Sequence, residues 1–256
     1  MFEVVLTQIS ESLRSLILRQ VQLIRKRPCT HKTVVILALC SRATRLNEAL
    51  IILSHSGFRD EAAALLRVLI EVVVNGAYLM VTEDKEFNAF VAHPMVMLGK
   101  HHRSYLAQWG DQTSFTEDFN ELVASGAAEA AAISNRTEKD SSWTSEGVRK
   151  RADLADSQFK HSDFSYLATT AYVEGNNFIH GNFSSLIEII GEFQGETPSR
   201  EEIRVHEDSK LSGATWALWD YAMALDQHFT TNLSMELKQI LSSFPNVEGS
   251  APDKHH

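Results

Sequence analysis

Apolar residues recur at helical spacing over most of this chain, and no segment shows the strict alternation typical of a half-buried strand. Between residues 2 and 26 they fall every three or four positions, with arginines and serines between them. The same pattern extends over six further segments and a shorter basic one: 32–54, 59–80, 84–109, 117–133, 163–180, 211–241 and 145–155. The pattern therefore predicts an all-α protein.

The segment 59–80 differs from the others because it is apolar on nearly every side. A helix of this kind belongs in the middle of a bundle. Its valine run at 72–74 is strand-like, but some twenty residues without a turn signal favour a helix. Arg67, Glu71 and Asn75 interrupt the apolar run, so a buried helix is predicted rather than a membrane span of roughly 18 to 20 apolar residues.

Short breaks separate the predicted helices. Pro94 lies inside the 84–109 segment and is expected either to kink that helix or to split it. Residues 134–142 are the most loop-like, yet neither flank has the composition of an independent domain. Residues 191–208 are polar and predict a loop with a turn of helix. We therefore expect one bundle of about seven to nine helices over residues 1–244 and a disordered tail over 245–256.

Composition bounds the class of protein without giving a function. At 256 residues the chain is near the upper size for one hydrophobic core, and only five prolines and twelve glycines interrupt it. A net charge of −9 argues against a broadly basic nucleic-acid surface, so such a role would rest on local patches. Cys29 and Cys40 lack metal-type spacing and are expected to be reduced, buried thiols. The first residues lack signal-peptide features, which predicts a soluble, cytoplasmic protein without membrane association.

The first candidate site lies on the apolar 59–80 segment. Arg67 and Glu71 are four residues apart, so they share one face of the predicted helix. Burying either charge without a partner would be costly, which leaves two interpretations. The two side chains form an internal ion pair that fixes helix packing, or they line a cleft that holds a ligand.

The second candidate site lies near the end of the 163–180 segment, where Glu174, Asn177 and His180 follow one another at intervals of three. Gly181 comes next, so other groups can approach His180 closely. His180 either interacts with the helix dipole or acts in acid–base chemistry or phosphate contact, with Asn177 orienting the ligand. Of two earlier tyrosines, one is expected in the core and the other beside the same groove: Tyr166 and Tyr172.

Other patterns predict no cofactor and no metal. His93, His101 and His102 are not spaced as compact metal ligands and are expected on the solvated surface. No glutamate has a histidine three residues later, which excludes the di-iron pattern of ferritin-like bundles. A Gly-rich phosphate loop, a Cys-x-x-Cys pair and a Gly-x-Ser-x-Gly elbow are also absent from the sequence. Three short basic clusters are expected to be solvated helix ends: 25–27, 100–103 and 149–151.

The order of these motifs resembles a known family. Arg67 and Glu71 are followed by Tyr78, then by Ser-Trp-Thr at 142–144, and then by a Tyr-rich segment that ends Asn-x-x-His-Gly at 177–181. Over residues 40–190 this order looks like a bacterial family of helical proteins of unknown function, similar to the HEPN (higher eukaryotes and prokaryotes nucleotide-binding) superfamily. The resemblance implies a helical bundle, often a homodimer, that binds a nucleotide or RNA in a defence or toxin–antitoxin setting.

Many HEPN proteins are metal-independent RNases that use Arg-x(4–6)-His on one helix, and others bind without catalysis. In this chain the arginine nearest before His180 is Arg151, so Arg67 would have to supply the cation from a neighbouring helix. The resemblance implies a nucleotide or RNA site with these further binding residues: Glu71, Tyr78, Tyr172, Glu174 and Asn177.

Three alternatives follow from this reading. The first is an RNase that uses His180 and Arg67 at the phosphate. The second is a non-enzymatic protein-interaction scaffold in which the Arg67–Glu71 pair is structural. The third is a small-molecule pocket between the 59–80 and 163–180 helices.

Overall fold

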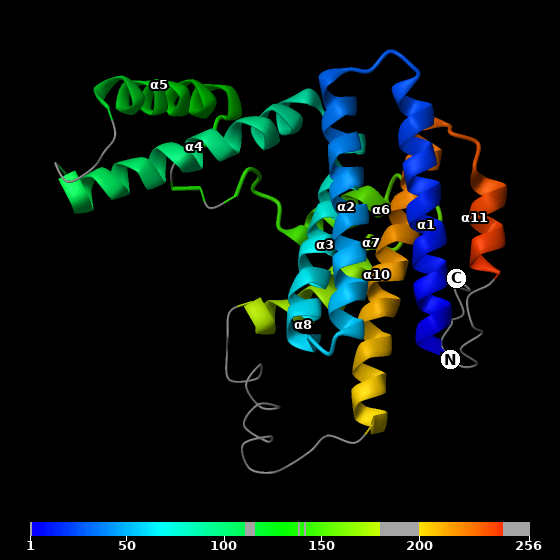
Figure 1. Ribbon diagram of the computed structural model, residues 1–256. Coiled ribbons are helices and arrows are strands. Elements are labelled where there is room, and N and C mark those ends of the chain that lie inside the picture. The colour runs from blue at the N-terminus through cyan, green and yellow to red at the C-terminus, as the bar shows by residue number, and fades with distance from the viewer. Residues whose placement is uncertain (1, 111–115, 138, 141, 180–199, 243–256) are drawn as a thin grey trace, which may run out of the picture. The chain divides into compact units, whose positions relative to one another are not determined.

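The computed structural model describes residues 2–110, 116–137, 139–140, 142–179 and 200–242 (Figure 1). Throughout these ranges the regular elements are helices, which confirms the predicted all-α class. The chain divides into two compact units, residues 1–80 with 148–256 (unit 1) and residues 81–147 (unit 2). The single domain over 1–244 stays a prediction, and the tail at 245–256 lies outside the described residues.

Unit 1 contains the long helices α1 (Phe2–Arg25), α2 (His31–His55), α3 (Arg59–Val81) and α10 (Arg200–Phe229). Figure 1 shows α1, α2 and α10 running beside one another, and the three pack together in pairs. The described part of the unit also contains four shorter helices: α6 (Val148–Asp156), α7 (Phe164–Thr169), α8 (Ala171–Ile179) and α11 (Ser234–Leu241). In α1 the buried apolar residues keep the predicted three- and four-residue spacing: Leu6, Ile9, Leu13, Leu16, Ile17, Val21 and Ile24.

Helix α3 is the buried helix that its sequence predicts, with every side chain from 72 to 80 buried. Gly76 lies against α10, where an added Cβ would come within 2.1 Å of the Tyr221 hydroxyl oxygen, so glycine is needed at this crossing. The Cys40 thiol of α2 donates to that same hydroxyl oxygen at 3.5 Å. Burial raises the pKa of the Cys40 thiol to about 12, so it stays protonated at neutral pH.

One described helix is long and apolar enough to cross a membrane by length and composition alone. It is Asp60–Val81, which is nearly all of α3, and 67% of its most apolar window is buried inside the protein. That burial is typical of a core helix and is compatible with a soluble protein.

Two helix predictions in unit 1 need correction. The predicted 163–180 helix is broken at Thr170 into α7 and α8, and the first turn of α7 is capped by the Asp156 carboxylate, which accepts hydrogen bonds from the backbone N–H groups of Phe164 and Ser165. The predicted 211–241 helix is two helices, and α10 already begins in the segment that the sequence assigned to a loop. Residues Thr230 and Asn232, between α10 and α11, have φ angles of 50° and 62°, which no helix continues through.

One of the two cysteines also differs from its prediction. Cys40 is buried as expected, whereas Cys29 is exposed in the short connection between α1 and α2. Pro28 ends the helical pattern just before it, and connections of this kind run over the surface.

Unit 2 is a hairpin of α4 (Asp84–Trp109) and α5 (Glu117–Ser134). Pro94 lies inside α4 and does not split it. The two helices pack closely where Gly99 faces Ala127, since an added Cβ on Gly99 would come within 2.4 Å of the Ala127 Cβ. His102 was predicted on the solvated surface, and this was wrong. It is buried between the helices, with its Nε2 2.8 Å from Asn120 Oδ1.

Candidate functional site

Helix α8 approaches α3 most closely beside Arg67. Gly175 permits this approach, because a Cβ added there would come within 2.5 Å of the Arg67 Cβ and 2.8 Å of the Ala63 carbonyl oxygen. The two helices that carry the sequence-predicted site residues are therefore neighbours within unit 1 (Figure 1).

The Arg67 guanidinium contacts three side chains among the described residues. Its Nη1 forms an ion pair with Glu71 Oε2 at 3.0 Å. Its Nε donates to Asn176 Oδ1 at 2.8 Å, and its Nη2 donates to the Tyr172 hydroxyl oxygen at 2.8 Å. The guanidinium also lies 4.7 Å from the centroid of the Tyr172 ring, which is a cation–π contact. The Arg67 and Glu71 side chains keep 22% and 32% of their surface exposed, so solvent reaches this pair.

Both α8 partners of Arg67 come from one face of that helix. Tyr172 and Asn176 are four residues apart, which places them on successive turns. Each uses its side-chain oxygen as the acceptor, so together they fix two of the three nitrogens of the guanidinium. The plane of the Arg67 side chain is thereby set by α8 as well as by Glu71.

Arg151 of α6 brings a second guanidinium to this region. Only 3% of Arg151 is exposed, and its Nη1 donates to Asn75 Oδ1 of α3 at 2.5 Å. Burial lowers the pKa of Arg151, while Glu71, Tyr172 and Tyr78 act in the opposite direction. The Glu71 carboxylate therefore acts electrostatically on Arg151 as well as pairing with Arg67.

The burial of Arg151 contradicts the prediction that residues 149–151 form a solvated helix end. Arg149 and Lys150 are exposed as expected, but Arg151 shares the buried face of α6 with Ala152 and Ala155. Ala152 and Ala155 have no exposed surface, so this face of α6, with Arg151 on it, is covered by neighbouring parts of the protein.

We call the following residues the Arg67 cluster: Arg67, Glu71, Asn75, Arg151, Tyr172 and Asn176. A guanidinium has five N–H donors, and the partners of Arg67 within the described residues take three of them. Among the described residues the other two N–H groups, one on Nη1 and one on Nη2, have no partner, and solvent reaches the side chain. A planar group held in this way can bind two oxygen atoms of one anion, as arginine does with phosphates and carboxylates.

The other predicted site residues have different outcomes. Tyr78 is buried and close enough to Arg151 to influence its pKa. Tyr166 is exposed, although it was expected in the core or beside the groove. Glu174 and Asn177 lie on α8, but their side chains are not among those described. His180 lies outside the described residues.

Sequence reasoning missed three members of the Arg67 cluster. Asn75 lies one turn beyond Glu71, and Asn176 lies one turn beyond Tyr172. Both asparagines could have been found from the sequence, because Asn75 is the residue four positions after Glu71 and Asn176 is the residue four positions after Tyr172. For Arg151 the only signal was its place beside Ala152 in an otherwise polar helix, which does not reveal what covers it.

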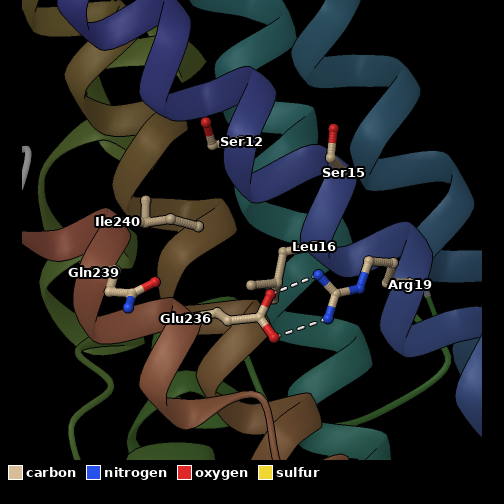
Figure 2. Close-up of a pocket in the computed structure, with 7 residues that line it drawn as sticks. All are labelled: Ser12, Ser15, Leu16, Arg19, Glu236, Gln239 and Ile240. Atoms are coloured by element: carbon tan, nitrogen blue, oxygen red, sulfur yellow. Dashed lines mark hydrogen bonds and ion pairs between the residues drawn. The ribbon is translucent and has the colours of Figure 1, made fainter.

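A separate groove of about 320 Å³ lies between α1 and α11 (Figure 2). Two nitrogens of Arg19 donate to the two carboxylate oxygens of Glu236 at 2.5 and 2.8 Å. The hydrogen bonds from Arg19 lower the pKa of Glu236, and those to Glu236 raise the pKa of Arg19. Because these two charges satisfy each other, the groove is left with short polar and apolar side chains: Ser12, Ser15, Leu16, Gln239 and Ile240.

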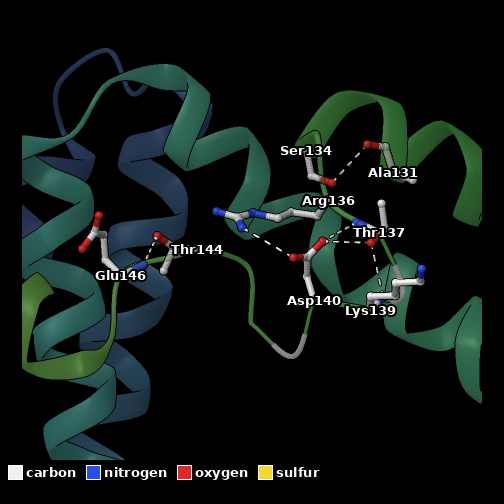
Figure 3. Close-up of polar contacts among 8 residues, drawn as sticks. All are labelled: Ala131, Ser134, Arg136, Thr137, Lys139, Asp140, Thr144 and Glu146. Carbon is white, nitrogen blue, oxygen red and sulfur yellow. Dashed lines mark hydrogen bonds and ion pairs between the residues drawn. The ribbon is translucent and has the colours of Figure 1, made fainter.

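Unit 2 contains a smaller polar pocket of about 200 Å³ beside the C-terminal end of α5. Figure 3 shows the adjoining contacts, in which Arg136 lies 3.9 Å from Asp140 and the backbone N–H of Thr137 donates to Asp140 at 2.7 Å. The bonds from Thr137 lower the pKa of Asp140. The pocket residues are of mixed charge: Lys85, Glu86, Ala89, Ser134, Asn135, Arg136 and Ser145.

Over the described ranges, no three or more His, Cys, Asp or Glu side chains are grouped so that they could hold a metal ion. The Arg67 cluster thus stands out by its cations and hydrogen-bond donors.

Comparison with known proteins gives a family and no function. The model of a family described as "Family of unknown function (DUF5677)" matches residues 33–197, which is well over half of the chain. The matched range includes every residue of the Arg67 cluster. Neither the curated proteins nor the solved structures gave a match.

Proposed function

The chain belongs to the family of unknown function DUF5677, so its activity has to be inferred from its own residues, and we propose that the Arg67 cluster binds the phosphate of a nucleotide or of RNA. The supporting observation is the Arg67 guanidinium, which three side chains hold in place while two of its N–H groups have no partner among the described residues. The similarity to the HEPN superfamily, which suggests this class of ligand, stays a prediction because the matched family has no known function.

Phosphate suits the chemistry of the Arg67 cluster. A guanidinium presents parallel N–H groups that match two oxygens of one phosphate. The bonds to Tyr172 and Asn176 hold this fork in one orientation before a ligand arrives, so less side-chain entropy is lost on binding. The Tyr172 hydroxyl accepts from Arg67, and its own O–H, which has no acceptor among the described residues, can donate to a further phosphate oxygen.

The charge of the whole chain sets a condition on this proposal. With a net charge of −9, long-range attraction does not concentrate polyanions at the surface, so affinity has to come from contacts at the cluster. Arg151 supports such contacts because its buried charge adds to the positive potential near Glu71 and Tyr172. Binding is therefore expected to depend on Arg67 itself far more than on exposed arginines elsewhere.

A metal-independent RNase is the second candidate function. The observation that favours it is helix α8, which carries Tyr172 and Asn176 to Arg67 and is followed in sequence by His180. In this mechanism a ribose 2′-hydroxyl oxygen attacks the adjacent phosphorus while the 5′ oxygen leaves. His180 would move the proton, and Arg67 would stabilise the charge on the phosphate oxygens.

A structural role is the third candidate, and the two hydrogen bonds from Arg67 to Tyr172 and Asn176 of α8 favour it. In that case the guanidinium joins α3 to α8 in a non-enzymatic scaffold and binds no ligand. Because a structural arginine needs no accessible donors, a variant that removes Arg67 would lower stability without altering any ligand affinity.

The direct test is a binding titration of the full chain with a fluorescent ATP analogue and with a 5′-labelled single-stranded RNA. Arg67→Ala and Arg67→Lys are each expected to weaken binding by about tenfold or more, because lysine keeps the charge and loses the fork. Arg45→Ala is the matched control, since Arg45 is an exposed arginine on α2 with the same charge. Equal affinities for wild type and Arg67→Ala, in a folded variant, would contradict the proposal.

The RNase candidate needs its own experiment. Labelled RNA is incubated with the protein in EDTA, and His180→Ala is compared with wild type and with His101→Ala, an exposed histidine of α4. Cleavage that is lost only in His180→Ala supports catalysis by His180. If the wild-type protein binds RNA without cleaving it, the result contradicts the RNase candidate and is compatible with the binding function.

A further inference from the structure

The hairpin of unit 2 leaves a row of large apolar side chains exposed along α4. The exposed residues follow one another at intervals of four, three, seven and four: Val91, Met95, Leu98, Tyr105 and Trp109. These are the intervals of one heptad seam, in which position 102 fills the gap. His102 occupies that position and is bonded to Asn120 of α5. No Asp, Glu, Lys or Arg interrupts this row.

Helix α5 has a matching row on the same side of the hairpin. Its exposed apolar residues are Phe119, Leu122 and Ile133, and the same three- and four-residue spacing passes through Gly126 and the exposed Glu129, which is the charged position of this row. The two rows adjoin at two points. The end of the Met95 side chain lies 3.2 Å from where a Cβ on Gly126 would be, and the His102 ring packs edge-on against Phe119 with centroids 5.6 Å apart.

Each helix of the hairpin therefore has two apolar faces. One is buried between α4 and α5 by Val96, Gly99, Val123, Ala127 and Ala130. The other is the exposed row, whose centre lies roughly 90° around the helix from the buried one. A helix at the corner of a four-helix bundle has this arrangement, because it contacts one neighbour on each of two adjacent sides. The hairpin thus has the form of half a bundle.

We propose that the exposed face of the α4–α5 hairpin pairs with the same face of a second copy of this chain to form a four-helix bundle. This face consists of the eight exposed residues named above, which are 38% to 68% exposed. Together they present on the order of several hundred Å² of apolar surface, above the scattered exposure of ordinary surfaces. A stable dimer buries about 800 Å² on each partner, and this face supplies much of that area.

A second copy fits this face better than an unrelated partner does. A two-fold interface uses the same patch on both molecules, so the patch has to be complementary to itself. Two hairpins meet this condition, because both helices carry an exposed row that is apolar except at Glu129 of α5, and each row of one copy can pack on a row of the other. The row of α4 also lacks the charged side chains that are depleted from the centres of interfaces. This inference does not depend on the Arg67 cluster.

The test measures the mass of the full chain in solution by light scattering and sedimentation. Wild type is expected to be a dimer at micromolar concentration. The double variant Leu98→Glu with Leu122→Glu is expected to raise the dimer dissociation constant by about 100-fold or more, because unpaired carboxylates would be buried in the interface. The matched control is Val34→Glu with Ile52→Glu on α2, whose residues are 53% and 59% exposed and should leave the mass unchanged.

Three results would overturn the proposal. The wild-type protein could be a monomer at about 100 µM. The Leu98→Glu, Leu122→Glu variant could remain a dimer. The variant could also lower the melting temperature without changing the mass, which would mean that another segment of the same chain covers the face.

A cross-linking measurement keeps the proposal testable if the double variant does not fold. Leu98→Cys is introduced in a Cys29→Ser background, which removes the exposed thiol, and is treated with a short bismaleimide. A covalent dimer is expected, and Val34→Cys in the same background should give little. Equal cross-linking from both positions would contradict the proposed face.

Discussion

Two arginine–glutamate pairs in unit 1 have similar bond lengths and different surroundings. Arg19 and Glu236 join α1 to α11 through two hydrogen bonds, with side chains 52% and 41% exposed. Arg67 and Glu71 make one 3.0 Å contact within α3, with 22% and 32% exposed. By geometry between the two residues alone, the Arg19 pair would be the stronger of the two.

The difference lies in what else each arginine contacts. Arg67 also bonds to Asn176 and Tyr172 of α8 and stacks on an aromatic ring, whereas the Arg19 pair lies in solvent, which screens it. Exposed pairs of this kind contribute little, while hydrogen bonds to a partly buried charge contribute more. The surroundings of a pair therefore say more about its role than the shortest distance within it.

The largest expected effect comes from separating α8 from Arg67. Gly175→Ala places a Cβ within 2.8 Å of the Ala63 carbonyl and is expected to cost about 2–3 kcal/mol of unfolding free energy, as overpacking does. Phosphate binding should weaken with it. Gly147→Ala is the control, because a Cβ there meets nothing within 4 Å. Denaturant titrations measure the unfolding free energy of each variant. A Gly175→Ala protein as stable as wild type would show that α8 can move away from α3 without loss of stability.

Removing Arg67 should have the next largest effect on stability. Arg67→Ala leaves Glu71, Asn176 and Tyr172 without their shared donor, and about 2 kcal/mol is expected to be lost. Arg45→Ala, on the exposed side of α2, should stay within about 0.5 kcal/mol of wild type. Urea unfolding followed by circular dichroism gives both values. Equal values for the two variants would mean that the Arg67 contacts do not stabilise the fold.

The same contrast between buried and exposed groups predicts a pH dependence in unit 2. Burial lowers the pKa of His93 below 6.5, with Arg136 acting in the same direction and Asp140 against it. The unfolded chain then takes up the proton first, so stability should fall as the pH drops from about 7.5 to 5.5. Melting temperatures across this range should fall less steeply for His93→Gln than for wild type. His101→Gln, at an exposed position, should leave the slope unchanged.

The smallest effect is expected at the exposed pair. Arg19→Ala should leave the melting temperature unchanged within error at physiological ionic strength, since solvent and salt screen the pair with Glu236. A small decrease should become visible only at low salt. If Arg19→Ala lowered the melting temperature more than Arg67→Ala, surroundings would be a poor guide and the geometry of the pair would matter more.

The long helices could be predicted from the sequence because their signals are local. Periodic apolar positions and the breaks at Pro28, Gly57 and Gly110 place α1 to α5 within one or two residues of their observed ends. The break at Thr170 has no such signal, since no glycine or proline marks it. The chain leaves the helical conformation at Thr170, with φ −100° and ψ −88°. The start of α7 likewise depends on a contact distant in sequence, since Asp156 caps it from the end of another helix. The charged start of α10 was missed because it lacks apolar periodicity.

The residues of the candidate site also fall into those that local sequence signals predict and those that depend on contacts distant in sequence. The pairing of Arg67 with Glu71 follows from their spacing on one helix, and Tyr172 belongs to the segment that the sequence already placed beside a groove. The burial of Arg151 depends on which helices cover α6. The spacing of residues within α6 gives no information about those neighbouring helices. For the same reason His102 was assigned to the surface, although α5 covers it.

The spacing of Tyr172 and Asn176 on α8 restricts which changes of length this chain can accept. Both residues reach Arg67 because they are one helical turn apart. One residue inserted between them would rotate Asn176 by about 100° away from the guanidinium, whatever the inserted residue is. Related chains that keep this site should therefore vary in sequence here without gaining or losing residues. Insertions should instead gather in connections such as that between α5 and α6, where no helical turn has to be preserved.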